Sequence, residues 1–122
     1  MGTKKMNDPG PAKDEPTATE LLESFSFRLT QARIATGYKT RKSLADDIGV
    51  DQNTYSPWER GRSYPNIKDL HTIRRLLRIS ADWLLYGDEN NLSVETYRKL
   101  KDAEPATSEI WAKRKSQKST KT

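Results

Sequence analysis

Apolar residues recur at helical spacing between Glu20 and Gly87, and polar residues separate them. Gly37 follows the first such stretch, and glycine readily adopts the positive φ at which helices often end. The pattern therefore predicts a first helix that begins near Glu20 and ends at about Thr36. The residues expected on its buried face are Leu21, Leu22, Phe25, Leu29, Ala32 and Ile34.

Two short helices around a tight turn are predicted next. Thr40 and Asp51 have side-chain oxygens suited to capping a helix, and Gly49 and Gly61 are placed to end the helices they start. The residues expected to face the core between these limits are Leu44, Ala45, Ile48, Tyr55 and Trp58.

A fourth and a fifth helix complete the periodic part of the chain. Asn66 is a cap before the strongest amphipathic stripe, and Ser80 is a cap before a short helix that Gly87 closes. We therefore expect an all-α fold, with a compact five-helix domain over residues 20–87. The stripe of the fourth helix consists of Ile67, Leu70, Ile73, Leu76 and Leu77.

The periodicity is lost on both sides of this domain. Residues 1–19 are rich in Pro, Gly and charge, which predicts a flexible, disordered arm. Residues 88–122 form a C-terminal extension in which Ser93 can cap a short helix over residues 94–103. We expect Pro105 to end that helix, because proline has no N–H to donate. The last ten residues have five basic and no acidic side chains, which predicts a basic, solvated tail.

The overall composition narrows the function. The 122 residues have a formal net charge of +5 and a pI near 9.5, which favours a polyanionic partner. With no cysteine and one histidine, the chain has no disulfide and no thiolate site, so we expect neither a metal nor a cofactor, and no enzyme activity. Neither a membrane span nor a secretory signal is evident, and we expect a cytoplasmic, nucleoid-associated protein.

Four residues have the spacing that a helix-turn-helix needs. Ala45 is small where two helices cross closely, and Gly49 permits the turn four residues later. Tyr55 and Trp58 then attach the second helix to the core. Because all four positions agree, the set is far more specific than a lone glycine.

The segments LADDIGVDQNTYSPWERGRSYPN and ISADWLLYG resemble the Xre and Cro-like family of phage and bacterial transcriptional repressors. The resemblance covers about Phe27 to Gly87. It implies a homodimer on a two-fold-related operator in double-stranded DNA, with the third helix in the major groove. It also implies a buried ion pair between Arg33 and Glu59, which would position the third helix without touching DNA.

In that docking mode, side chains near the start of the third helix meet base edges. Gln52 and Asn53 are the expected readers, because an amide both donates and accepts and so matches the N6 and N7 edge of adenine. Ser56, one turn later, is a lesser candidate. The residues expected to bind the phosphate backbone are Arg41, Arg60, Arg62 and Asn66.

Two features leave alternatives open. Pro57 lies inside the third helix, where it predicts a kink or a shortened helix and shifts recognition toward Gln52 and Asn53. The same module can instead serve as an antitoxin or a protein-interaction adaptor that grips a partner through its tail or its fifth helix. The gripping residues would be Trp83, Leu84 and Tyr86. We place the dimer contact on the fifth helix and residues 94–100, and no small-molecule ligand is inferred.

Overall fold

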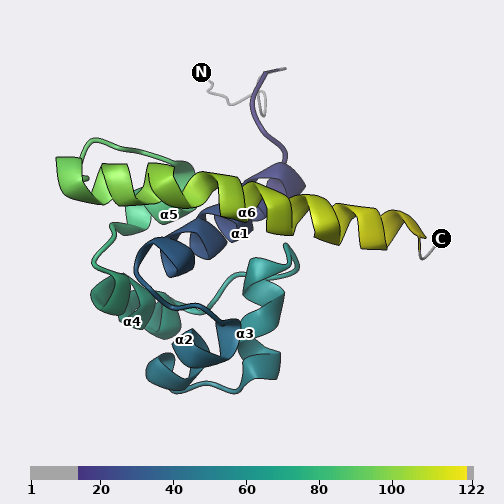
Figure 1. Cartoon of the computed structure of the whole chain (residues 1–122), viewed down its shortest axis with the longest axis horizontal. Helices are drawn as coiled ribbons and strands as arrows, with labels where there is room; N and C mark the ends of the chain where they lie inside the picture. Colours follow the sequence, from purple (N-terminus) through teal and green to yellow (C-terminus); the bar gives the residue numbers. More distant parts are fainter. Residues whose placement is uncertain (1–13, 121–122) are drawn as a thin grey trace, which may run out of the picture.

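The computed structural model describes residues 14–120, with side chains described as far as Ser116. This part of the chain folds into helices without strands, as predicted. Its six helices are the five expected and a sixth that begins where a short helix was possible (Figure 1). They are α1 (Ala18–Ala35), α2 (Arg41–Ile48), α3 (Gln52–Glu59), α4 (Ile67–Leu77), α5 (Ala81–Tyr86) and α6 (Val94–Thr120).

Helices α2 to α5 begin at the predicted capping residues. Thr40, Asp51, Asn66 and Ser80 each accept a hydrogen bond from a backbone N–H in the first turn of the following helix. The expected arm falls mostly on residues 1–13, which lie outside the described part. At its end, Thr17 forms a capping box, so α1 begins earlier than expected.

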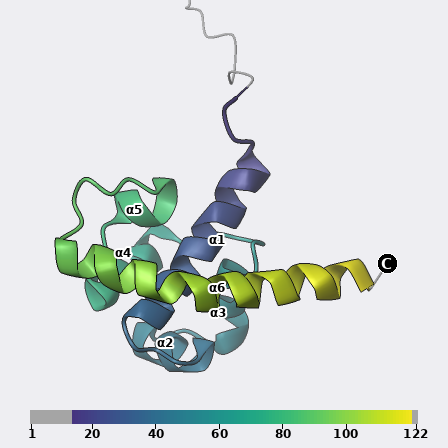
Figure 2. The same cartoon turned by 45° about the horizontal axis from the view of Figure 1, so that its top comes forward.

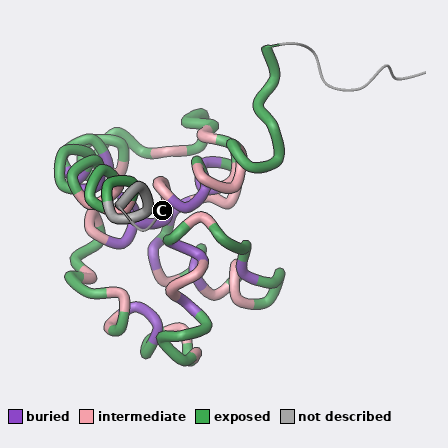
Figure 3. The backbone as a smooth tube through the Cα atoms, turned by 90° about the vertical axis from the view of Figure 1, so that its right-hand side faces the viewer, coloured by how far each residue is buried: buried purple, intermediate pink, exposed green. Residues whose placement is uncertain are grey.

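The core is built around α1, which packs against α3, α5 and α6 (Figures 1 and 2). The buried segments gather where these elements meet, and the exposed ones face outward (Figure 3). The largest apolar side chains that are fully buried are Phe25, Leu29, Leu44, Tyr55, Ile73 and Leu84.

Helix α6 corrects the prediction for the C-terminal extension. The expected helix over residues 94–103 does not end at Pro105 but continues to Thr120 and crosses α1 (Figure 2). Pro105 is exposed, so water can bind the carbonyl that lacks a helical donor. Meanwhile Leu100, Ala103 and Thr107 are buried on the opposite face. Tertiary packing therefore outweighs the local effect of the proline.

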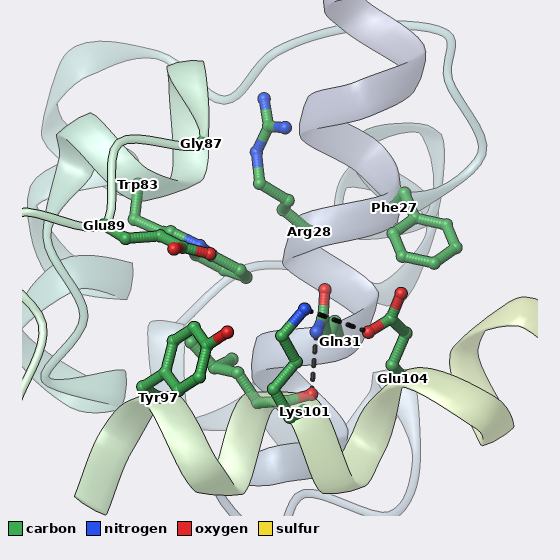
Figure 4. A pocket seen from close by; sticks show the side chains of 10 residues that line it. Phe27, Arg28, Gln31, Trp83, Gly87, Glu89, Tyr97, Lys101 and Glu104 are labelled. Carbon is green, nitrogen blue, oxygen red and sulfur yellow. Dashed lines mark hydrogen bonds and ion pairs between the residues drawn. The ribbon is translucent and has the colours of Figure 1, made fainter. Parts of the chain in front are cut away.

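Hydrogen bonds from α1 hold the later helices in place. Gln31 donates its amide N–H to the carbonyl of Leu100 on α6, at 2.7 Å (Figure 4). Arg28 donates to the carbonyls of Leu84 and Leu85 at the end of α5, at 3.0 and 2.9 Å. Burial lowers the pKa of Arg28, and its position at a helix C-terminus offsets part of that cost. A pocket of about 240 Å³ remains between these elements.

Within residues 14–120, none of the helices combines the length and apolar character required to cross a bilayer. The same residues contain no cluster of three or more His, Asp or Glu side chains that could hold a metal ion.

Candidate nucleic-acid interface

The α2–turn–α3 unit has the geometry that its sequence predicts. Ala45 is fully buried, and Gly49 ends α2 with φ at +92°. A Cβ at Gly49 would meet nothing within 4 Å, so the turn requires glycine for its backbone conformation and not for space. The buried rings of Tyr55 and Trp58 meet edge to face, with centroids 5.4 Å apart, and attach the inner side of α3 to the core.

The outer side of α3 presents the predicted reading residues to solvent. Gln52 and Asn53 are exposed in its first turn, and Ser56 is half-buried one turn later. The carboxylate of Asp51 accepts a hydrogen bond from the backbone N–H of Asn53 at 2.7 Å, which leaves the Asn53 side chain out of the cap. Pro57 lies in the last turn of α3, which extends two residues beyond it and has eight residues in all.

The predicted phosphate-binding residues lie in three settings. Arg60 and Arg62 are exposed after α3, where the chain turns toward α4. Asn66 accepts the capping hydrogen bond of α4 from Asp69 N at 2.8 Å, so its amide N–H groups remain for a phosphate. Arg41 is half-buried at the start of α2. Arg41 therefore belongs partly to the interior.

The buried end of α3 is organised around the carboxylate of Glu59, which is 0% exposed. Arg33 Nε lies 2.6 Å from Glu59 Oε2, so the ion pair that the family resemblance implied is present. The hydroxyl of Thr30 donates to Oε1 at 3.0 Å, and that of Tyr55 to Oε2 at 2.5 Å. Burial raises the pKa of Tyr55 well above its ordinary value, and the charge of Glu59 raises it further.

Glu59 also contacts an arginine of α6, and this contact was not predicted. Arg114 Nη1 donates to the backbone carbonyl of Glu59, and Nη2 lies 3.4 Å from Oε1. Its guanidinium also lies 5.7 Å from the ring centroid of Trp111, which packs edge to face on Phe27 of α1. The sequence contains a sign of this arrangement, since Leu100, Ala103, Thr107, Trp111 and Arg114 follow at steps of three and four.

Two residues proposed for gripping a partner protein are part of the core instead. Trp83 and Leu84 are 5% and 0% exposed, whereas Tyr86 is 70% exposed. Leu100, which we had placed in the dimer contact, is also buried. These three apolar side chains are buried within the domain, so they are unavailable to a second protein.

Comparison with known families agrees with this geometry. Residues 29–84, from the middle of α1 to α5, match the family model described as helix-turn-helix. The α2–turn–α3 unit lies inside the matched residues. The match agrees with the resemblance to the Xre-type family.

Curated relatives are regulators from bacteria. The chain is 39% identical over 51 residues to the HTH-type transcriptional regulator DicA of Escherichia coli, which is 42% of this chain and 38% of DicA. It is 33% identical over 72 residues to the HTH-type transcriptional activator BcrR of Enterococcus faecalis, which is 59% of this chain and 35% of BcrR. The prophage-derived uncharacterized regulator YonR of Bacillus subtilis is 33% identical over 71 residues, 58% of this chain and 65% of YonR. The chain thus spans less than two thirds of each relative, and no solved structure matches it significantly.

Proposed function

We propose that this chain is a sequence-specific transcriptional repressor that binds double-stranded DNA as a dimer, with α3 in the major groove. The observation that carries the proposal is the division of α3 into two faces. Tyr55 and Trp58 fix the inner face to the core, while Gln52 and Asn53 project from the first turn of the outer face. An amide held in this way offers the paired donor and acceptor that discriminate adenine, worth about 1–3 kcal/mol for each good contact.

Charges around α3 support a polyanionic partner. Arg60 and Arg62 follow the reading helix, and the helix N-terminus capped by Asn66 comes directly after them. Phosphate contacts of this kind set the register of a protein on the duplex and supply affinity without sequence preference. The specific contribution is therefore expected from Gln52 and Asn53, and the general one from the arginines.

Exposed apolar side chains support a dimer. Tyr86 at the end of α5 is 70% exposed, and Val94 at the start of α6 is 75% exposed. A second copy that covers both would bury these side chains. A two-fold dimer on DNA then requires its two reading helices to reach half-sites about one helical turn, ~34 Å, apart.

We propose repression and not activation because repression demands less of the protein. Occupying a promoter is enough to block transcription, whereas activation also needs a productive contact with the polymerase. BcrR is named as an activator, so activation is the alternative to repression. A reporter assay with the operator placed upstream or downstream of the transcription start distinguishes the two. Repression predicts that reporter output falls when the protein is expressed.

Selection of bound duplexes from a random pool tests sequence specificity directly. We expect a two-fold symmetric motif, and a loss of about five- to hundredfold in affinity for it when Gln52 is replaced by alanine. The Gln52→Ala protein should bind scrambled DNA as the parent does, because an uncharged side chain adds little to phosphate attraction. Enrichment of no motif would refute the proposal and favour an adaptor that retains DNA only through charge.

The Arg62→Gln variant provides the contrasting control. Removing one phosphate contact should weaken binding to the selected and scrambled duplexes alike. It should also reduce the slope of log affinity against log salt concentration by about one unit. An unchanged slope would remove Arg62 from the phosphate contacts and leave the base-reading assignment intact.

A further inference from the structure

Helix α3 has little stability of its own. It has eight residues, and Pro57 in its last turn offers no N–H to the carbonyl of Asn53. Helices this short are marginal in water, so their geometry depends on tertiary contacts. The contacts at its C-terminal end are therefore important for how α3 is held.

The last four carbonyls of α3 all have donors, from three different parts of the chain. The carbonyls of Ser56 and Pro57 accept from the backbone N–H groups of Arg60 and Arg62, at 3.1 and 3.0 Å. Among residues 14–120 no backbone N–H donates to the other two, which accept from side chains of other helices. Ser26 of α1 donates to Trp58 O at 2.6 Å, and Arg114 of α6 donates to Glu59 O.

Arg114 also contacts the Glu59 side chain that Arg33 neutralises. Arg33 alone balances the charge of the carboxylate, so Arg114 is the second guanidinium at a site that needs one. Burial lowers the pKa of Arg114, a cost that the charge of Glu59 only partly offsets. What this arginine adds is a planar fork that binds the backbone and the side chain of one residue at once.

We propose that Arg114 is a positioning residue for DNA reading, which fixes the C-terminal end of α3 to α6 so that its first turn meets the bases at a set angle. The inference rests on the proposed function. Trp111 supports the contact from the same helix, since its ring would lie 3.6 Å from a Cβ at Gly61, directly beyond α3. Helix α6 thus contacts the end of the reading helix and lies close to the turn that follows it.

This role predicts a loss of discrimination that exceeds the loss of general affinity. Direct base readout requires side chains to be held within about half an ångström, whereas contacts with phosphates tolerate small rotations of the helix. Without Arg114, α3 keeps its inner aromatic anchors and Arg33 but loses the contact that fixes its last carbonyl. The arginines after α3 remain available to phosphates.

The experiment compares Arg114→Ala with Lys113→Ala in the full chain. Lys113 is exposed and adjacent, so its replacement removes the same charge without touching Glu59. Affinity is measured for the selected duplex and for a scrambled duplex of equal length, at one salt concentration and well below the melting temperature of each variant. Amide hydrogen exchange of α3 and α4 is recorded on the same proteins.

We expect Arg114→Ala to lower the ratio of specific to nonspecific affinity by about ten- to hundredfold, and Lys113→Ala to leave it unchanged. Exchange should accelerate in α3 and not in α4. An equal ratio in the two variants, with a parent that reads sequence, would overturn this inference alone. A parent that binds every duplex equally would overturn the proposed function as well.

Arg114→Lys keeps the experiment decisive if the alanine variant does not fold. Lysine retains the charge and most of the aliphatic stem, but a single ammonium lacks the planar fork. A specificity ratio below that of Lys113→Ala would support positioning by the guanidinium. A ratio equal to that of Lys113→Ala would show that the fork is not needed, and would overturn the inference.

Discussion

At the scale of single residues, the surroundings of Tyr55 link stability to alkaline pH. Burial first, and the negative charge of Glu59 second, raise its pKa well above the ordinary value of 10.0. Because the folded state then binds the phenolic proton more tightly than the unfolded chain, this contribution is complete below about pH 10. It is lost as the pH rises toward the pKa of the folded state.

We expect Tyr55→Phe to have two effects on unfolding by denaturant. At neutral pH the free energy of unfolding should fall by about 1.5–3 kcal/mol, because Glu59 loses a donor. Between about pH 10 and 12 the remaining stability should fall less steeply than in the parent, because phenylalanine has no phenolic proton to lose. Tyr86→Phe, at an exposed site, is the control and should follow the parent. Parallel pH curves for all three proteins would contradict the assignment.

The contacts of Glu59 also show which side-chain contacts could be predicted from the sequence. The ion pair with Arg33 was available from the family resemblance. The contact with Arg114 joins residues 55 positions apart, and no local pattern specifies such a pair. Gln52 and Asn53 were assigned to base reading because the family resemblance places the start of the third helix against the bases, and both are exposed. Helical periodicity separates Asn53 from the face of Tyr55, but it does not separate Gln52, which lies three residues before Tyr55.

At the scale of elements, the end of α4 differs from the other tight helix ends. Arg78 takes the left-handed conformation with φ at 57°, while Gly37, Gly49, Gly61 and Gly87 supply glycine where φ is positive. An L-residue in this conformation costs about 1–2 kcal/mol relative to its favoured regions. Arg78 therefore reduces the stability of a helix end that glycine would satisfy.

We expect Arg78→Gly to raise the free energy of unfolding by about 0.5–1 kcal/mol, because the relief of strain exceeds the added entropy of the unfolded chain. Arg78→Ala serves as the control for loss of the side chain and should not stabilise. Gly49→Ala should have the opposite sign, a loss of about 1–2 kcal/mol, since space is open but the backbone conformation is unfavourable. Thermal unfolding of the three variants measures these differences, and a destabilised Arg78→Gly protein would refute the account.

Five of the six helices were predictable because each begins at a polar cap and carries large apolar residues at helical spacing. Helix α6 was only partly predictable. Its buried stripe includes Ala103 and Thr107, whose small or polar side chains give little hydrophobic periodicity. Pro105 then indicates a helix end by local rules, and only the packing against α1 explains why the helix continues.

At the scale of the whole molecule, the exposed side chains of Tyr86 and Val94 predict how copies associate. We expect the double variant Tyr86→Asp and Val94→Asp to sediment as a monomer under conditions where the parent is a dimer. It should bind an isolated half-site as the parent does, and the full two-fold site more weakly. Both substitutions introduce charge at exposed positions, so folding should be preserved.

Lys99→Asp is the matched control, because it changes an exposed charge on α6 without removing apolar surface. If the parent sediments as a monomer and one copy binds each DNA site, the proposed dimer is refuted. If the parent is a dimer that the double variant leaves intact, the interface lies elsewhere on the molecule.

The bond from Gln31 to Leu100 has a consequence for the order of folding. It joins residues 69 positions apart, so the intervening chain must close a long loop before α6 can settle on α1. Loop closure becomes more costly with length, and contacts of this range form slowly compared with those among neighbouring helices. The helical hairpins of the middle of the chain are thus expected to assemble first, with α6 docking as the late step that completes the native state.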